Sequence, residues 1–530
     1  MVEHHFTIAR TVLNSDCRNL TLVTVNGISP GPPIHVNFND TLVVNVRNEM
    51  PDPIDKVTIH WHGLHQFGTL SSDGLAGITQ YPIGYNETYR YQFIVRDPPG
   101  TYLYHAHTQM HIVGVHGALI IHEQGWNGRK PDNELQYDEE KIIVLSDYYP
   151  EDISSFDTNV VYNYTIRYKN LNPVGLLING RSLNCTNGIG PPNFIEVMPG
   201  KTYRVRLINA ASQTYQALKV EDHDMILVEA DGRMLEPLTV SQIELHSGQR
   251  YSFLLRTDKS PRSYLVGTAT HNIDTLVPFS SAVWLHYKGA PPPVLPKNLA
   301  ELNNTVQSLI PKVNFINGWI VDQLRPKINQ FYRPPPPYTR EIILRISNNN
   351  TSTAEYPVGQ WKINDMAFER PSLPMIYNST IMCKTAINVS TLKDSYDPST
   401  NTYPIQQGEV IQVIVQNHAF SDSGYVLPHP WHQHGHSFWD LGGGPGAYSQ
   451  SKCSRMLNTK NPILRDTTWP SPNTPDGWRA YRFVAFNPGL WLAHCHINFH
   501  HHVGMAIVFA ERKRDGTIPL QINSSTPIGY

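Results

Sequence analysis

Three stretches of the chain share one pattern of apolar and polar positions. Each has a short strand-like run, a polar turn and a longer alternating run that ends near an asparagine; they are Ile34–Asn48, Ile195–Asn209 and Ile405–Asn417. Alternation of apolar and polar side chains is typical of half-buried β-strands. The Asn-Asp, Pro-Gly and Gln-Gly pairs between the runs predict hairpins. Recurrence of the whole pattern predicts three copies of one β-sandwich domain.

Length and composition agree with this division. A chain of 530 residues is long enough for about three domains. Its 42 prolines and 35 glycines fit a turn-rich, all-β protein. We place the domains at residues 1–125, 126–300 and 338–530. The stretch 301–337 ends in four consecutive prolines and is predicted to be a stiff linker, because proline runs favour extended geometry.

Charge and hydropathy exclude two classes of partner. With a net charge of −2 and a pI near 6.9, the chain lacks the basic excess of a nucleic-acid binder or of a protein held electrostatically at a membrane. It also has no run of 18 apolar residues, so we expect no segment that spans a membrane.

Sequons point to secretion. Asn-X-Ser/Thr sites, the acceptors of N-linked glycans, are dense along the chain. They lie at Asn19, Asn39, Asn86, Asn163, Asn184, Asn303, Asn349, Asn350, Asn378, Asn388 and Asn523. No signal peptide is visible at Met1, and we expect that one was removed ahead of it. The predicted protein is a secreted, glycosylated monomer.

Four His-X-His pairs carry the clearest chemistry in the sequence. They are His60-Trp61-His62, His105-Ala106-His107, His432-Gln433-His434 and His494-Cys495-His496. Alternate residues of a strand point to the same face, so each pair presents two imidazoles side by side. One such pair is weak evidence for a metal, because paired histidines are more often hydrogen-bonded packing. Four pairs among 25 histidines are improbable by chance.

The pairs lie in two groups, one near each end of the chain. Histidines from four strands of two distant domains meet only if the first and third domains touch. The chain is therefore predicted to fold back so that its ends are adjacent. The second domain has no such pair, and we expect it to hold the other two apart and to wall the approach to the substrate pocket.

The fourth pair overlaps a second set of metal-binding side chains. On a strand, Cys495 points away from His494 and His496, and both His500 and Met505 follow it closely. Thiolate, imidazole and a weak thioether are the ligand types of a blue-copper centre. One short segment then serves two metal sites back to back, and its peptide bonds give electrons a covalent route between them.

These motifs resemble those of the multicopper oxidases, the family of laccases, ascorbate oxidases and ferroxidases. The likeness covers most of the chain, and its motifs occur in the family order. It rests on His60-Trp61-His62-Gly63, on His105 and His107, on the run from His429 to His436, and on His494-Cys495-His496 with His500 and Met505. It implies an all-β fold of three consecutive cupredoxin-like Greek-key β-sandwich domains.

The resemblance also implies four copper ions. His429, Cys495 and His500 would bind the type 1 copper, with Met505 as its axial ligand. His60 and His432 would bind the type 2 copper. The remaining ligands would hold the type 3 pair; they are His62, His105, His107, His434, His494 and His496.

Carboxylates are expected near a site where dioxygen takes up protons. Asp73 matches an acid that relatives have near their dioxygen site, although a turn aspartate is the plainer interpretation. Many relatives have a second acid three residues after the copper cysteine, and this chain has Asn498 there. We therefore assign catalytic roles to Asp73, Cys495, His494 and His496, and leave the second proton donor open.

The five cysteines extend the resemblance. Ascorbate oxidases bridge their first and second domains at positions matching Cys17 and Cys185, and this pairing leaves Cys383 with Cys453. From residues alone, four cysteines besides Cys495 allow three connectivities.

The implied activity is that of a copper-dependent oxidoreductase with dioxygen as acceptor. We expect a laccase-like enzyme that oxidises phenols or related aromatic donors one electron at a time and reduces dioxygen to water. Ascorbate oxidase is the alternative and ferroxidase the third choice. Two residues bear on this order: a methionine such as Met505 accompanies the lower-potential relatives, and Gln213 aligns where many laccases have an acid.

Overall fold

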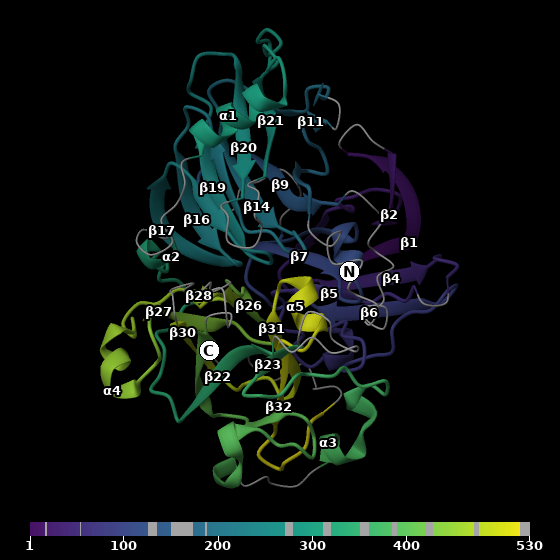
Figure 1. Cartoon of the computed structure of the whole chain (residues 1–530), viewed down its shortest axis with the longest axis vertical. Coiled ribbons are helices and arrows are strands. Elements are labelled where there is room, and N and C mark those ends of the chain that lie inside the picture. Colours follow the sequence, from purple (N-terminus) through teal and green to yellow (C-terminus); the bar gives the residue numbers. More distant parts are fainter. Residues whose placement is uncertain are drawn as a thin grey trace.

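The structure is a computed structural model of the chain. It describes all residues except 16–18, 53–54, 126–134, 150–172, 186–187, 271–278, 311–319, 350–359, 384–388, 419–427, 471–475 and 520–530. Three β-sandwiches follow one another along the chain (Figure 1). This confirms the predicted fold class.

The first sandwich has two four-stranded sheets. One has the order β2 (Asn19–Val25), β1 (Val2–Asn14), β4 (Thr41–Asn48), β6 (Thr88–Ile94). The other has the order β3 (Ile34–Asn37), β8 (His116–His122), β7 (Gly100–Ala106), β5 (Ile59–His62). The 3-10 turns η1 (Leu70–Ser72) and η2 (His111–Val113) lie in its connections.

The second sandwich is larger. One sheet has the order β10 (Gly175–Ile178), β9 (Glu139–Tyr148), β14 (Thr202–Asn209), β19 (Arg250–Arg256), β16 (Met225–Ala230), β17 (Arg233–Val240). The other has the order β13 (Phe194–Val197), β21 (Ser280–Tyr287), β20 (Ser263–Ala269), β15 (Gln216–Val220), β18 (Ile243–Leu245). A short pair, β11 (Asn184–Cys185) and β12 (Gly188–Ile189), stands apart.

The third sandwich carries most of the remaining elements. One sheet has the order β23 (Gln360–Ile363), β22 (Arg340–Asn349), β25 (Val410–His418), β30 (Asp476–Val484), β27 (Phe438–Pro445), β28 (Leu464–Arg465). The other has the order β24 (Tyr403–Gln406), β32 (Ala506–Arg512), β31 (Gly489–Cys495), β26 (Trp431–Gln433), β29 (Thr467–Thr468). Its short helical pieces are α3 (Ser379–Cys383), α4 (Gln450–Cys453), α5 (Asn498–His502), η5 (Met375–Tyr377), η6 (Val389–Thr391), η7 (Lys393–Ser395) and η8 (Ser454–Met456).

Each of the three recurrent stretches forms the two strands that were expected. The two strands do not pair with each other, so they are not hairpins. In each domain the first strand of the motif joins one sheet and the second strand joins the other. The first strands β3, β13 and β24 pair in parallel with the last strands β8, β21 and β32. The hairpin prediction was wrong because alternation marks a half-buried strand without identifying its neighbour.

The predicted linker is partly helical. Helix α1 (Leu299–Leu309) begins at Asn298, whose side chain accepts a hydrogen bond from the Glu301 amide, as an N-cap does. Its buried residues Leu302 and Val306 pack with Leu265 and Trp284 of the second domain. A short α2 (Ile320–Gln323) follows. Apolar burial therefore ties the beginning of this stretch to the second sandwich.

The first and third domains are in direct contact, as the sequence predicted. Leu70, Leu75 and Ile78 of the first domain share one apolar cluster with Trp491 and Val508 of the third. In Figure 1 the strands β5 and β7 lie beside β26 and β31 at this junction. Each sandwich has its own hydrophobic core, so the interface lies between separately packed domains.

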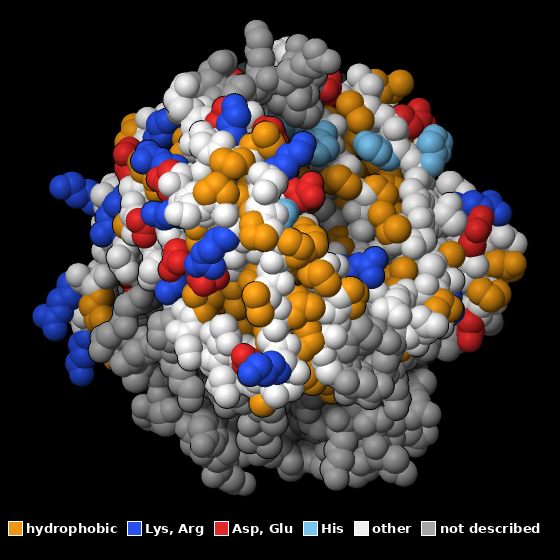
Figure 2. All heavy atoms as spheres, turned by 90° about the horizontal axis from the view of Figure 1, so that it is seen from above, with side chains coloured by type: hydrophobic (Ala, Val, Ile, Leu, Met, Phe, Trp, Pro, Cys, Tyr) orange, Lys and Arg blue, Asp and Glu red, His pale blue; other side chains and the backbone are white. Residues whose placement is uncertain are grey.

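The outer surface is mixed in charge. Figure 2 shows Lys and Arg side chains interspersed with Asp and Glu on the face seen from above. Among the described residues, no helix combines the length and the apolar character needed to cross a bilayer.

Candidate metal centres

Strand register brings the histidine pairs together. In the first domain β5 pairs with β7 so that His60 lies opposite His105. In the third, β26 pairs with β31 so that His432 lies opposite His494. The two strand pairs face each other across the domain interface. There the eight histidines of the four His-X-His pairs form one buried cluster. The ring centroids of His60 and His434 are 3.9 Å apart, and those of His62 and His432 are 3.8 Å apart.

The ring nitrogens of this cluster are arranged as a metal requires. The Nδ1 atoms of His60, His105 and His432 each donate to a backbone carbonyl, at 2.8–2.9 Å. Their Nε2 atoms are buried and have no hydrogen-bond partner. A ligating histidine keeps one nitrogen for the metal and gives the other to a partner in the protein. The donor set therefore fits copper, for which imidazole is a suitable ligand.

Burial favours the neutral form of most of these imidazoles. Desolvation, with the neighbouring imidazoles, holds the pKa values of most of the cluster well below their usual range. The pKa of His494 falls to about 3, mainly through burial. Neutral rings have a free lone pair at neutral pH and can bind a cation.

A second group of ligands lies within the third domain. The sulfur of Cys495 is 3.7 Å from Nδ1 of His429 and 3.5 Å from Nδ1 of His500, and these two nitrogens are 3.2 Å apart. Met505 is fully buried, and its backbone bonds those of Cys495 and His500. The predicted thiolate and imidazole ligands therefore converge. The axial role of Met505 stays a prediction.

An indole covers the edge of this second group. The ring of Trp361 on β23 lies 4.7 Å from the ring of His429 and 4.9 Å from that of His500. His500 is the half-buried member of the group, whereas His429 and Cys495 are buried. Of the three side chains in this group, His500 is therefore the most accessible to solvent.

Asp73 lies against the histidine cluster, and its catalytic role stays a prediction. It is fully buried, its carbonyl accepts from Nδ1 of His60, and its Oδ2 lies 3.0 Å from Nδ1 of His434. The turn interpretation is also true in part, because Asp73 ends the 3-10 turn η1. One carboxylate thus contacts a ligand from each of the two domains.

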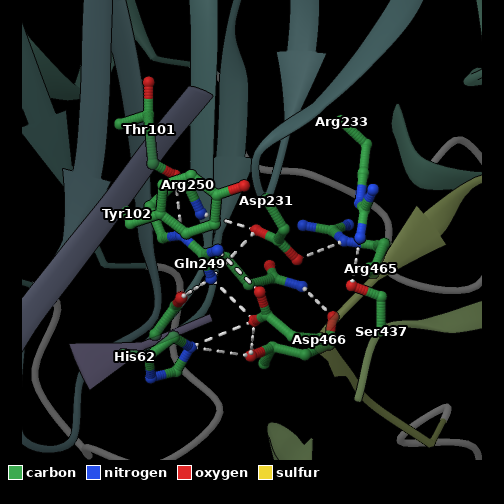
Figure 3. Close-up of polar contacts among 12 residues, drawn as sticks. His62, Thr101, Tyr102, Asp231, Arg233, Gln249, Arg250, Ser437, Arg465 and Asp466 are labelled. Atoms are coloured by element: carbon green, nitrogen blue, oxygen red, sulfur yellow. Dashed lines mark hydrogen bonds and ion pairs between the residues drawn. The ribbon is translucent and has the colours of Figure 1, made fainter. Parts of the chain in front are cut away.

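A second buried acid was missed by the sequence analysis. Asp466 accepts from Nε2 of His62 at 3.1 Å and receives both terminal nitrogens of Arg250, at 2.7 and 2.6 Å (Figure 3). Asp231 adds ion pairs to Arg250 and Arg465. The available signal was the Arg465-Asp466 dipeptide within an otherwise apolar and threonine-rich strand stretch, since buried charges are almost always paired.

One expectation about the cysteines needs correction. Cys453 is a free buried thiol packed with Trp439 and Trp478, so the bridge to Cys383 is wrong; the apolar core around it leaves the sulfur enclosed. The proposed bridge from Cys17 to Cys185 involves side chains outside the described residues. His501, which the sequence did not single out, is buried, with its ring 4.8 Å from that of His494.

Comparisons with known proteins point to a single family. Family profiles described as multicopper oxidase match residues 7–125, 139–290 and 368–515. An L-ascorbate oxidase of Brassica rapa subsp. pekinensis is 33% identical, covering 95% of this chain and 91% of its own length. Laccase-like multicopper oxidase 1 of Thermothelomyces thermophilus is 28% identical, covering 99% and 89%.

A solved structure is similar as well. The multicopper oxidase Fet3p, described as functioning in iron import, superposes with a TM-score of 0.75 at 24% identity, covering 99% of this chain and 93% of its own. That likeness concerns the fold. Profile matches along all three sandwiches, together with the identity to the Brassica enzyme, place the chain in the multicopper oxidase family.

Proposed function

We propose that the protein couples the oxidation of an ascorbate-type enediolate donor to the four-electron reduction of dioxygen to water. The observation that supports this choice is that the turn packed beside the type 1 group offers no free carboxylate as a proton acceptor. The turn Ala211–Thr214 lies against the helix bearing His500, because the Asn498 amide donates to the Ser212 carbonyl at 2.8 Å. Gln213 in this turn cannot act as a base.

An acid of the neighbouring strand β9, Asp147, is already hydrogen-bonded to this turn. The Asp147 carboxylate accepts from the amides of Ser212, Gln213 and Thr214 at 2.8–3.2 Å. Phenol oxidation gains from a base that takes the phenolic proton. Ascorbate is already a monoanion at neutral pH, so one of its two enolic protons has left before the first electron is taken. It depends less on such a base, and water can take its remaining proton. The likeness to the Brassica ascorbate oxidase supports the same choice.

The chain's residues would divide the work between two centres. Copper, when bound, supplies one-electron acceptance at the thiolate group and electron delivery to dioxygen at the histidine cluster. Trp361 and His500 would receive the donor. Cys495 and its peptide neighbours His494 and His496 join the two centres covalently. We propose four copper ions, one at the thiolate group and three in the cluster.

Phenol oxidation, expected from the sequence, is the second candidate. The flat indole of Trp361 against both type 1 imidazoles offers a surface on which an aromatic ring can stack. The Thermothelomyces relative is named a laccase-like enzyme. A phenol that ionises readily would also dispense with a base.

Secretion as a glycosylated monomer is also part of the proposal. The side chains of Asn19, Asn39, Asn86 and Asn378 are exposed, as a glycan-bearing asparagine must be. Digestion of the protein from its native host with an N-glycosidase should lower its mass, and an unchanged mass would contradict this part.

Oxygen uptake by the copper-loaded enzyme tests the choice of donor. We expect kcat/KM for ascorbate to exceed the values for 2,6-dimethoxyphenol and for ferrous iron at neutral pH. Gln213→Glu should raise the value for the phenol and change that for ascorbate little, whereas Gln307→Glu, on the exposed face of α1, should change neither. A wild-type preference for the phenol would overturn the proposal in favour of the second candidate.

A further inference from the structure

A turn of the second domain reaches the copper ligands. It joins β18 to β19 and consists of His246, Ser247, Gly248 and Gln249. Two hydrogen bonds close it: the Gln249 amide donates to the His246 carbonyl at 3.0 Å, and the His246 amide donates to the Gln249 side chain at 2.9 Å. The Gly248 amide is held by the Asn209 carbonyl at 2.8 Å. These hydrogen bonds, all within the second domain, therefore hold the turn in place without help from its contacts to the metal-binding histidines.

Ser247 contacts a ligand from the third domain. Its hydroxyl is fully buried and lies 2.9 Å from Nδ1 of His496. The same hydroxyl bonds the Ala211 carbonyl, which can only accept. Since a hydroxyl has one hydrogen and this hydrogen goes to Ala211, Ser247 must accept from the Nδ1–H of His496. The hydrogen of that ring is thereby kept at Nδ1, and the Nε2 lone pair faces the cluster.

Gly248 lies against ligands of both other domains. Its φ is +84°, and an added Cβ would stand 2.9 Å from Cδ2 of His496 and 2.9 Å from Cε1 of His62. Only glycine fits such a conformation and such a contact without strain. The bare backbone therefore forms a wall against which the two imidazoles rest.

Gln249 and Arg250, the next two residues, connect the turn to the third domain and to His62. The side chain of Gln249 donates to the Thr467 carbonyl at 3.3 Å. Arg250 holds Asp466, which accepts from Nε2 of His62. The Nδ1 of His62 then faces Nε2 of His496 at 3.1 Å. Figure 3 shows Gln249, Arg250, Asp466 and His62 converging at this point.

We propose that Ser247 is a positioning residue for the copper cluster, and that it acts by fixing the tautomer and the orientation of His496 while Gly248 fixes the ring plane. The second domain, which has no His-X-His pair, is thus the third wall of the cluster rather than a spacer alone. This inference concerns metal binding and stands apart from the choice of electron donor.

Ser247→Ala tests the proposal, with Ser281→Ala as a matched control. Ser281 is another fully buried serine of the same domain, and its hydroxyl bonds Ser182 at 2.8 Å. Loss of a partner of a metal-ligating histidine weakens metal binding by about 10- to 100-fold. We expect this loss in Ser247→Ala by competition with a copper chelator. We also expect a larger fraction of its copper to be visible by electron paramagnetic resonance, because an intact coupled pair is silent. Ser247→Thr, which keeps the hydroxyl, should recover most of the affinity.

The copper-free proteins separate positioning from folding. Both alanine variants should unfold at similar temperatures without copper, so that only the copper-dependent stabilisation differs between them. Wild-type copper affinity and resonance spectra in Ser247→Ala would overturn the proposal. Equal losses of copper in Ser247→Ala and Ser281→Ala, or a copper-free Ser247→Ala that unfolds far below the control, would also overturn it.

Discussion

The two centres of this protein are built in opposite ways. The thiolate group takes His429, Cys495 and His500 from one sandwich, and a single local segment supplies two of them. The histidine cluster takes its ligands from the first and third domains and further contacts from the second. The first centre therefore depends on the register of one domain, whereas the second depends on how three domains pack.

Cys495→Ser separates the centres most completely. Loss of the thiolate should remove the blue colour and lower turnover with every donor to background. The cluster should keep its copper, because its ligands His494 and His496 point to the opposite face of the strand from Cys495. Absorption spectra, oxygen uptake and copper content measure this. Cys453→Ser, which alters the free buried thiol, should keep both colour and turnover. Turnover by Cys495→Ser would mean that electrons enter elsewhere.

Asp73→Asn addresses the cluster alone. Because Asp73 contacts both His60 and His434, dioxygen turnover should fall by about 10²- to 10⁴-fold, the usual contribution of a positioned acid or base. Bleaching of the blue colour by an anaerobic donor should keep its wild-type rate. Asp97→Asn alters a buried acid that pairs with His65, outside the ligand set, and should lower turnover much less. Near-normal turnover in Asp73→Asn would refute the assignment.

Arg250→Met probes the three-domain packing. It leaves Asp466 buried without its cation, while Asp231 keeps its ion pair with Arg465, and breaking a buried ion pair costs about 3–5 kcal/mol. Urea unfolding of the copper-free protein should show this loss. Arg90→Met, at an exposed pair with Glu3, should cost less than about 1 kcal/mol. Equal losses of unfolding free energy in the two variants would show that the buried ion pairs stabilise the protein no more than an exposed pair does.

Met505→Leu should have the smallest effect. A weak thioether tunes the potential of a blue-copper centre without holding the metal, so the variant should stay blue and active, with a higher reduction potential in a redox titration. An unchanged potential would assign Met505 to core packing alone.

The two centres also differ in how far their residues can be predicted from the sequence. The His-X-His pairs and the Cys495 segment were found because a strand fixes the direction of each side chain locally. The chain's folding back was inferred correctly, since ligands at both ends need a shared interface. The turns of the three recurrent stretches were misassigned as hairpins, because alternation does not name the partner strand.

Residues that act through tertiary packing escaped the sequence analysis. Ser247 and Arg250 lie in one stretch and Asp466 in another, and only the packed structure brings the two stretches to His62 and His496. The bridge from Cys383 to Cys453 failed for a related reason, since sulfur positions depend on the packing of distant segments. Helix α1 was missed although Asn298 and Glu301 give it a recognisable start.

Anomalous X-ray diffraction at the copper edge, from crystals of the copper-loaded protein, tests the central claim most directly. The account predicts one peak among Cys495, His429 and His500, and a separate group of three peaks enclosed by the eight paired histidines at the junction of the first and third domains. Copper confined to the thiolate group, or bound away from the domain interface, would contradict it.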